Sequence, residues 1–131
     1  MKELSNHSCF LLFDIKKERI RIQKSTLRAM GPPNYIQLLV SPETAQVAIR
    51  GVSKEQSDDQ THRVRKKLLD QDVSYELYSA TFISLLGGLI PNLSPDYSYR
   101  LYGQVFPTEK LAIYSLQSVE RVERVENKEG C

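Results

Sequence analysis

Hydrophobic and polar residues alternate along several short stretches of this chain. The clearest is 19–22, where basic and β-branched side chains alternate as in a strand with one buried face. A short helix is expected next, with Ser25 as its N-cap and Gly31 in the left-handed position that often follows a helix. Residues 35–40 and 46–50 alternate again around a turn, which predicts a β-hairpin.

Residues 74–117 repeat this order of elements. Tyr75 and Leu77 are predicted to share one face of a strand. Ser79 then suits the N-cap of a second helix, and Gly87–Gly88 is expected to end that helix. Alternating residues, a turn and a further strand follow, as in the first stretch. We interpret the two stretches as an internal duplication; the alternative is chance similarity between two generic β-α-β-β units.

The chain of 131 residues is 40% hydrophobic, which suffices for one core and leaves little for a second. We therefore predict a single α+β domain: a small, mostly antiparallel β-barrel built from two related β-α-β-β units. The expected organisation is a flexible N-terminus (1–8), a barrel-like domain (9–118) with units 19–51 and 74–117 and a polar loop (51–60), and a loose C-terminal tail (119–131).

Three segments outside the two units have simpler patterns. Residues 9–15 are more continuously apolar than alternating, which predicts a strand covered on both faces. Residues 61–69 fit either a short strand or a helix, and the four-residue spacing of Val64 and Leu68 favours the helix. Valines three apart in the tail favour a frayed helix there.

A strand that ends in a lysine, a one-turn helix and a β-hairpin follow one another in the first unit. The residues that carry this pattern are Arg19, Ile20, Ile22, Lys24, Leu27, Arg28, Gly31 and the hairpin at 35–50. The pattern resembles the swapped-hairpin barrel of AbrB, MazE and SpoVT-type bacterial regulators. The resemblance implies two interlocked hairpins, normally from two chains, in a barrel that binds DNA through basic residues. Gln23 departs from that family, which usually has Pro there, and Pro32-Pro33-Asn34 replaces its usual Gly-Asp.

Positive charge is concentrated in the first unit. Residues 14–50 contain seven basic and three acidic residues, a net charge of +4, whereas residues 73–116 contain two basic and three acidic residues, a net charge of −1. Six of the basic residues fall within 13 positions: Lys16, Lys17, Arg19, Arg21, Lys24 and Arg28. We predict that they contact the phosphates of double-stranded DNA. The alternative is a solvated strand face whose charges keep a sheet edge soluble.

These observations give two functional hypotheses. The first is a DNA-binding transcriptional regulator, which needs a homodimer to read a symmetric site because only one unit of the chain is basic. The second is a non-enzymatic protein-interaction or adaptor module, in which the tyrosine-bearing second unit or an exposed strand edge binds another protein. Within that unit, Tyr97 and Tyr99 are expected to pack in the core, and Tyr102 is expected on the exposed face with Arg100.

Candidate catalytic and metal-binding groups are sparse. Cys9 and Cys131 lie near opposite ends, so we expect no disulfide framework and a reducing, cytoplasmic location. His7 and His62 are not at a metal-ligand spacing, and the chain has no nucleophile elbow or phosphate-binding glycine loop. We therefore predict no metal, no cofactor and no enzyme activity, and we rank a ligand-holding barrel last. No apolar run approaches the roughly 20 residues of a membrane span, so no membrane insertion is expected.

Overall fold

The computed structural model describes residues 7–53, 61–65 and 74–122 of the chain. These residues form nine strands, two α-helices and two short 3-10 helices. In chain order the strands and α-helices are β1 (His7–Asp14), β2 (Arg19–Gln23), α1 (Lys24–Ala29), β3 (Tyr35–Ser41), β4 (Gln46–Val52), β5 (Thr61–Arg63), β6 (Ser74–Tyr78), α2 (Ala80–Leu89), β7 (Ser98–Phe106), β8 (Leu111–Ser115) and β9 (Glu120–Val122).

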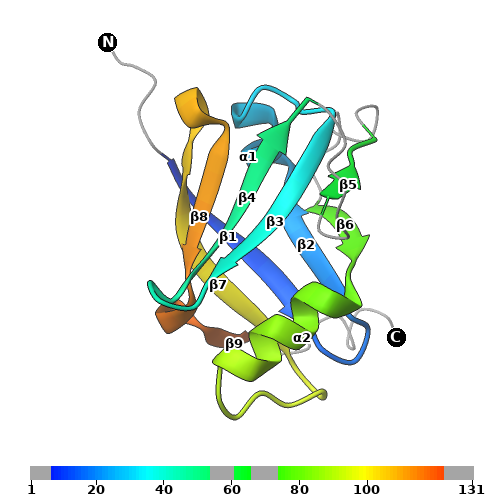
Figure 1. Cartoon of the computed structure of the whole chain (residues 1–131). Helices are drawn as coiled ribbons and strands as arrows, with labels where there is room; N and C mark the ends of the chain where they lie inside the picture. The colour runs from blue at the N-terminus through cyan, green and yellow to red at the C-terminus, as the bar shows by residue number, and fades with distance from the viewer. Residues whose placement is uncertain (1–6, 54–60, 66–73, 123–131) are drawn as a thin grey trace.

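The strands form one antiparallel sheet that curls into a half-barrel (Figure 1). The strand order is β5-β3-β4-β8-β7-β1-β2-β6, and β9 pairs with the first residues of β7. The two ends of the sheet approach each other, because the Tyr75 hydroxyl on β6 accepts a hydrogen bond from the Arg65 N–H (2.8 Å) and donates one to the Arg63 carbonyl (3.3 Å). The predicted α+β class and mostly antiparallel sheet are confirmed, and the half-barrel is consistent with the predicted small barrel.

Alternation along the strands fills the inside of the curl. In β2, Ile20 and Ile22 are fully buried, while the arginines between and before them face outward. In β7, Leu101 and Val105 are buried in the same cluster, as the alternating pattern predicts. Leu27 from α1 is fully buried in this cluster as well. One core therefore lies inside the half-barrel.

The first helix differs from the prediction at its start. α1 begins at Lys24 after Gln23, and no side chain caps its N-terminus, so the prediction of Ser25 as the N-cap is wrong. β2 runs directly into the helix, which places Ser25 inside the first turn and not before it. The end of the helix agrees with the prediction, because Gly31 has a left-handed φ of 73°.

The second helix confirms its predicted cap and corrects its predicted end. The Ser79 hydroxyl accepts a hydrogen bond from the Phe82 N–H at 3.1 Å. α2 continues through Gly87 and Gly88 to Leu89, so the prediction that the glycines end the helix is wrong. Each glycine costs a helix only about 1 kcal/mol. Burial of apolar side chains along the helix, with Leu86 fully buried, offsets this cost.

Both ends of the domain extend further than the predicted boundaries. β1 begins at His7, within the segment expected to be flexible, and pairs with β7 along its whole length. Glu120–Val122 form β9 against β7, so the helix predicted from the valine spacing is wrong for these residues. Thr61–Arg63 form a strand, the other alternative for that segment. The remainder of the predicted tail (123–131) and most of the predicted polar loop (54–60) lie outside the described residues.

Candidate functional site

The six basic residues predicted to contact DNA lie in three separate places. Lys16 and Lys17 are exposed in the turn between β1 and β2. Lys24 and Arg28 belong to α1, which lies at the opposite end of β2 from that turn (Figure 1). The two arginines between them face outward from β2 itself. The structure therefore does not gather the six charges into one patch.

The β2 arginines are held by carboxylates from other strands. Arg19 donates two hydrogen bonds to the Asp14 carboxylate, at 3.0 and 3.2 Å, and its side chain is only 14% exposed. Arg21 pairs with Glu76 on β6 at 3.1 Å, and Glu76 also lies 3.8 Å from Arg19. A phosphate would have to compete with these intramolecular partners for both guanidinium groups.

A third arginine on the same outer face is also paired. The Arg100 guanidinium on β7 lies 3.8 Å from the Glu120 carboxylate and 4.7 Å from the centre of the Phe10 ring. Tyr102 is 41% exposed, as predicted, and its hydroxyl donates to Glu120 at 2.6 Å. Tyr99 is buried and stacks on a core phenylalanine, which confirms its predicted place in the core. Each of the three arginines on this face therefore has a carboxylate partner.

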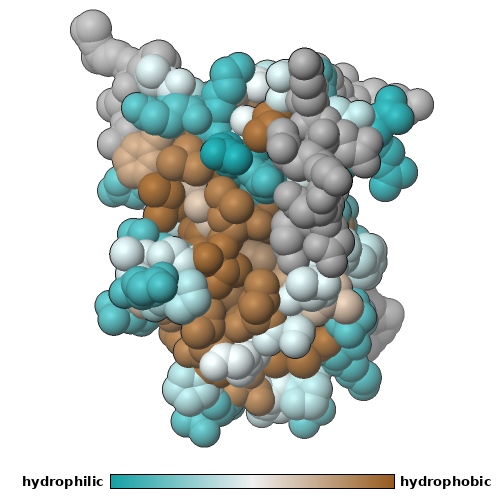
Figure 2. Space-filling model, in the orientation of Figure 1, coloured by the Kyte–Doolittle hydropathy of each residue, from teal (hydrophilic) through white to brown (hydrophobic). Residues whose placement is uncertain are grey.

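A charge-free apolar area lies on the opposite side of the half-barrel, where sequence reasoning predicted no site. Leu39, Ala48 and Ile113 are neighbours across β3, β4 and β8, since Leu39 pairs with Ala48 and Ala48 with Ile113. Their side chains alternate with the buried ones and so face outward; Leu39 is 36% exposed. Figure 2 shows apolar side chains gathered over these strands and continuing towards α2.

The exposed side of α2 extends this area. Leu85 and Leu89 are 45% and 37% exposed and lie four residues apart, on one side of the helix. We call Leu39, Ala48, Ile113, Leu85 and Leu89 the apolar face. Two sequence signals were available for it: no charged residue occurs between 79 and 95, and the apolar run 38–40 breaks the alternation of its strand.

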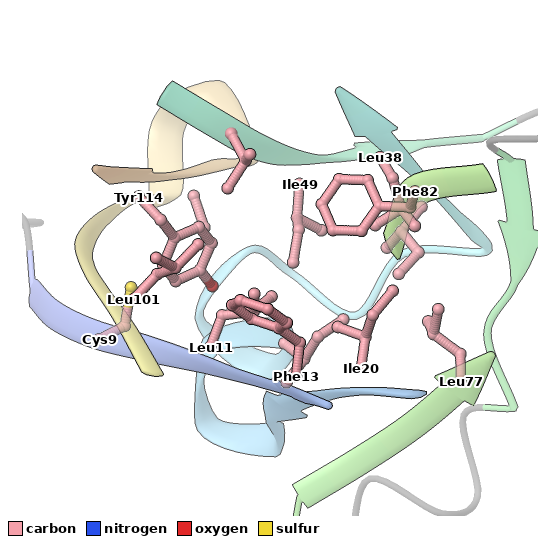
Figure 3. Close-up of a cluster of buried hydrophobic side chains, with 14 of the residues drawn as sticks. Cys9, Leu11, Phe13, Ile20, Leu38, Ile49, Leu77, Phe82, Leu101 and Tyr114 are labelled. Atoms are coloured by element: carbon pink, nitrogen blue, oxygen red, sulfur yellow. The ribbon is translucent and has the colours of Figure 1, made fainter. Parts of the chain in front are cut away.

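Two buried ionisable side chains lie at one end of the core. Cys9 and Tyr114 lie at the same end of the core in Figure 3, and the side chain of Thr26 approaches both. Burial raises the pKa of the Cys9 thiol, and burial together with the nearby thiol raises the pKa of Tyr114 well above its usual range. The Tyr114 hydroxyl is buried without a hydrogen bond of regular geometry. A thiol with a raised pKa is a weak nucleophile at neutral pH.

Groups suited to metal binding do not cluster in the described part of the chain. No set of three or more His, Cys, Asp and Glu residues there is arranged to hold a metal ion. Neither α1 nor α2 has the length and apolar content needed to cross a bilayer.

Comparison with known proteins identifies no family for this chain. No protein-family model, no curated protein and no solved structure matches the chain.

Proposed function

We propose that the chain is a non-enzymatic protein-interaction module that binds its partner through the apolar face. The observation that carries the proposal is the exposure of Leu85 and Leu89 on a helix without any charged residue, beside the outward-facing row that contains Leu39. Single exposed leucines are ordinary, whereas a contiguous apolar area on a soluble domain marks an interaction surface.

The chemistry of the apolar face also indicates the kind of partner. Protein interfaces have a core depleted of charge, surrounded by a polar rim. Here the charge-free centre is bordered on β4 by Arg50, whose guanidinium is held by the side chain of Gln37 on β3. An apolar surface on a second protein, with polar or acidic groups at its edge, complements this arrangement.

Site-specific photo-cross-linking tests the proposal. A photoreactive amino acid at Leu85 or Leu39 is expected to give one discrete protein adduct in a lysate of the source cells. The same residue at Lys17, exposed in the β1–β2 turn, is the control and is expected to give none. Leu85→Asp should abolish the adduct formed at Leu39, whereas Ser84→Asp places the same charge on an exposed neighbouring position and should preserve it. Equal labelling at Lys17, or no adduct from either leucine, contradicts the proposal.

Double-stranded DNA is the second candidate partner. The exposure of Lys16 and Lys17 at one turn supports it, because neither side chain has a carboxylate partner in the described part of the chain. Two phosphate contacts would give a slope of log affinity against log salt of about −2. Fluorescence anisotropy with duplex DNA at two salt concentrations measures this slope, with Lys16→Gln/Lys17→Gln as the variant. Absence of salt-dependent binding removes this candidate, together with the expectation drawn from the AbrB-type resemblance.

We also propose that the half-barrel is an internal repeat, with β1-β2-α1-β3-β4 as one unit and β5-β6-α2-β7-β8 as the other. The strand order supports this proposal. The hydrogen bonds of Tyr75 to residues 63 and 65 make β6 a neighbour of β5, so the strand order can be treated as a closed ring. When each strand of one unit is exchanged with its counterpart in the other (β1 with β5, β2 with β6, β3 with β7, β4 with β8), every strand keeps equivalent neighbours in this ring. Superposition of β2-α1-β3-β4 on β6-α2-β7-β8 in a crystal structure tests it, and failure of the helices to overlay contradicts it.

A further inference from the structure

A cleft of about 350 Å³ opens between the outer face of β1 and the start of α1. Phe10 and Leu12, two outward-facing residues of β1, provide its apolar lining. The remaining walls are polar or cationic and include Lys24, Ser25 and Ser74. The cleft is separate from the apolar face, since it shares no residue with it.

Lys24 is the unusual residue of this cleft. It is only 6% exposed, and its ammonium has no ion pair or hydrogen bond in the described part of the chain. By contrast, the outward-facing arginines of β2 and β7 each have a carboxylate partner. Lysines are almost never this buried unless their charge is compensated or the ammonium still reaches water. In the described part of the chain, the Lys24 Nζ is not among the fully buried polar atoms without a partner, so the ammonium keeps some access to solvent. The cleft that Lys24 lines is the place where an anion can compensate it.

The other polar groups of the cleft are suited to the same ligand. Ser25 is exposed, and its hydroxyl is not used as a helix cap. Gln23 accepts a hydrogen bond from the Phe10 N–H at 2.8 Å through its carbonyl oxygen, which leaves its amide NH₂ group to donate. Among the described residues, none that lines the cleft carries a carboxylate. Arg28 also lines the cleft but already has an interaction of its own, so the proposal rests on Lys24.

We propose that this cleft binds a small organic anion. Its phosphate or carboxylate group lies at Lys24, with Ser25 and Gln23 as additional donors, and its apolar body lies on Phe10 and Leu12. Charge-assisted hydrogen bonds to the ammonium provide the polar part of the affinity. The Arg100 guanidinium over the Phe10 ring, 4.7 Å from its centre, holds that ring in place as part of the lining.

Titration of the ¹⁵N-labelled full chain followed by NMR tests the proposal. Two probes, phenyl phosphate and phenylacetate, carry both an anionic group and an apolar body. Inorganic phosphate lacks the apolar body, and benzyl alcohol lacks the charge. One of the first two is expected to move the amide signals of Phe10, Ser25 and Ser74 and to bind at least about fivefold more tightly than inorganic phosphate and benzyl alcohol. The tighter of the first two identifies the natural head group as phosphate or carboxylate.

A matched pair of variants distinguishes the cleft from general positive charge. Lys24→Met keeps the buried stem and removes the charge, and should weaken binding by about tenfold or more. Lys17→Met removes one exposed charge at the other end of β2 and should change affinity by less than about twofold. Equal losses in the two variants, or saturating ligand that leaves the cleft amides unmoved in the unmodified chain, overturns the proposal. If Lys24→Met does not fold, the amide map and the probe comparison still decide it.

Discussion

Gly103 is the position where the fold depends most directly on a missing side chain. It lies in the middle of β7, opposite Cys9 on β1 and Tyr114 on β8. A Cβ atom built there would lie 1.9 Å from the carbonyl oxygen of Ile113 and 2.7 Å from the Tyr114 Cα. Both are backbone atoms, so no side-chain rotation relieves the clash. Gly103→Ala therefore forces β8 away from β7 where their hydrogen-bonded ladder begins.

The expected loss is large for a single methyl group. Overpacking a dense core typically costs about 1–3 kcal/mol, and separation of the two strands adds lost hydrogen bonds, so we expect Gly103→Ala to lower the free energy of unfolding by about 3 kcal/mol or more. With an m-value of about 2 kcal/mol per M, the midpoint of urea unfolding falls by roughly 1.5 M. Far-UV circular dichroism during urea titration measures it.

Gly88→Ala is the matched control. Gly88 is exposed in α2, its φ is not positive, and nothing lies within 4 Å of an added Cβ. Alanine there should raise the free energy of unfolding by about 0.5–1 kcal/mol, because glycine loses more backbone entropy in a helix. If Gly103→Ala unfolds within about 0.3 M urea of the unmodified chain, the close approach of β8 to β7 is refuted.

Three further predictions concern local interactions. Ser79→Ala should cost about 1 kcal/mol by removing the cap of α2, whereas Ser25→Ala, which removes no cap, should cost less than about 0.5 kcal/mol; equal losses in urea titrations contradict this assignment. Asp14→Asn should lower the free energy of unfolding by about 2 kcal/mol, because it weakens the partly buried ion pair with Arg19. An unchanged midpoint of thermal unfolding would contradict this prediction. Burial raises the pKa of Tyr114 in the folded state, so above roughly pH 10 only the unfolded state releases this proton and stability falls as the pH rises. Tyr114→Phe should remove that part of the alkaline loss, and an unchanged pH profile of the urea midpoint contradicts it.

Local sequence pattern predicted much of the secondary structure. Two of its errors, at the end of α2 and at β9, arose where tertiary contacts outweighed local preference. The strands around Ile20 and Leu77 follow from period-2 alternation, and the cap at Ser79 and the left-handed Gly31 follow from helix-end chemistry. The prediction of a helix end at Gly87 was wrong because burial of neighbouring positions outweighed glycine's weak local preference. Similarly, β9 replaced the expected helix because β7 offered an unpaired edge.

The candidate sites were less accessible to sequence reasoning. Proximity in the sequence suggested that Lys16, Arg21 and Arg28 act together, but a strand separates the ends of the group by its full length, and Arg21 meets a glutamate 55 residues away. The apolar face combines residues of β3, β4, β8 and α2, which no spacing rule connects.

The sequence by itself determined which side of the clearly alternating strands, such as β2 and β6, is buried against the core. That information is carried by alternation, a property of neighbouring residues. Tertiary structure alone decided which strands are adjacent. Strand adjacency in turn decides which arginines are neutralised, which lysine is buried without a partner and which leucines remain in water. These outcomes depend on contacts between residues far apart in the chain, and the free energy of such contacts is not encoded in any local pattern.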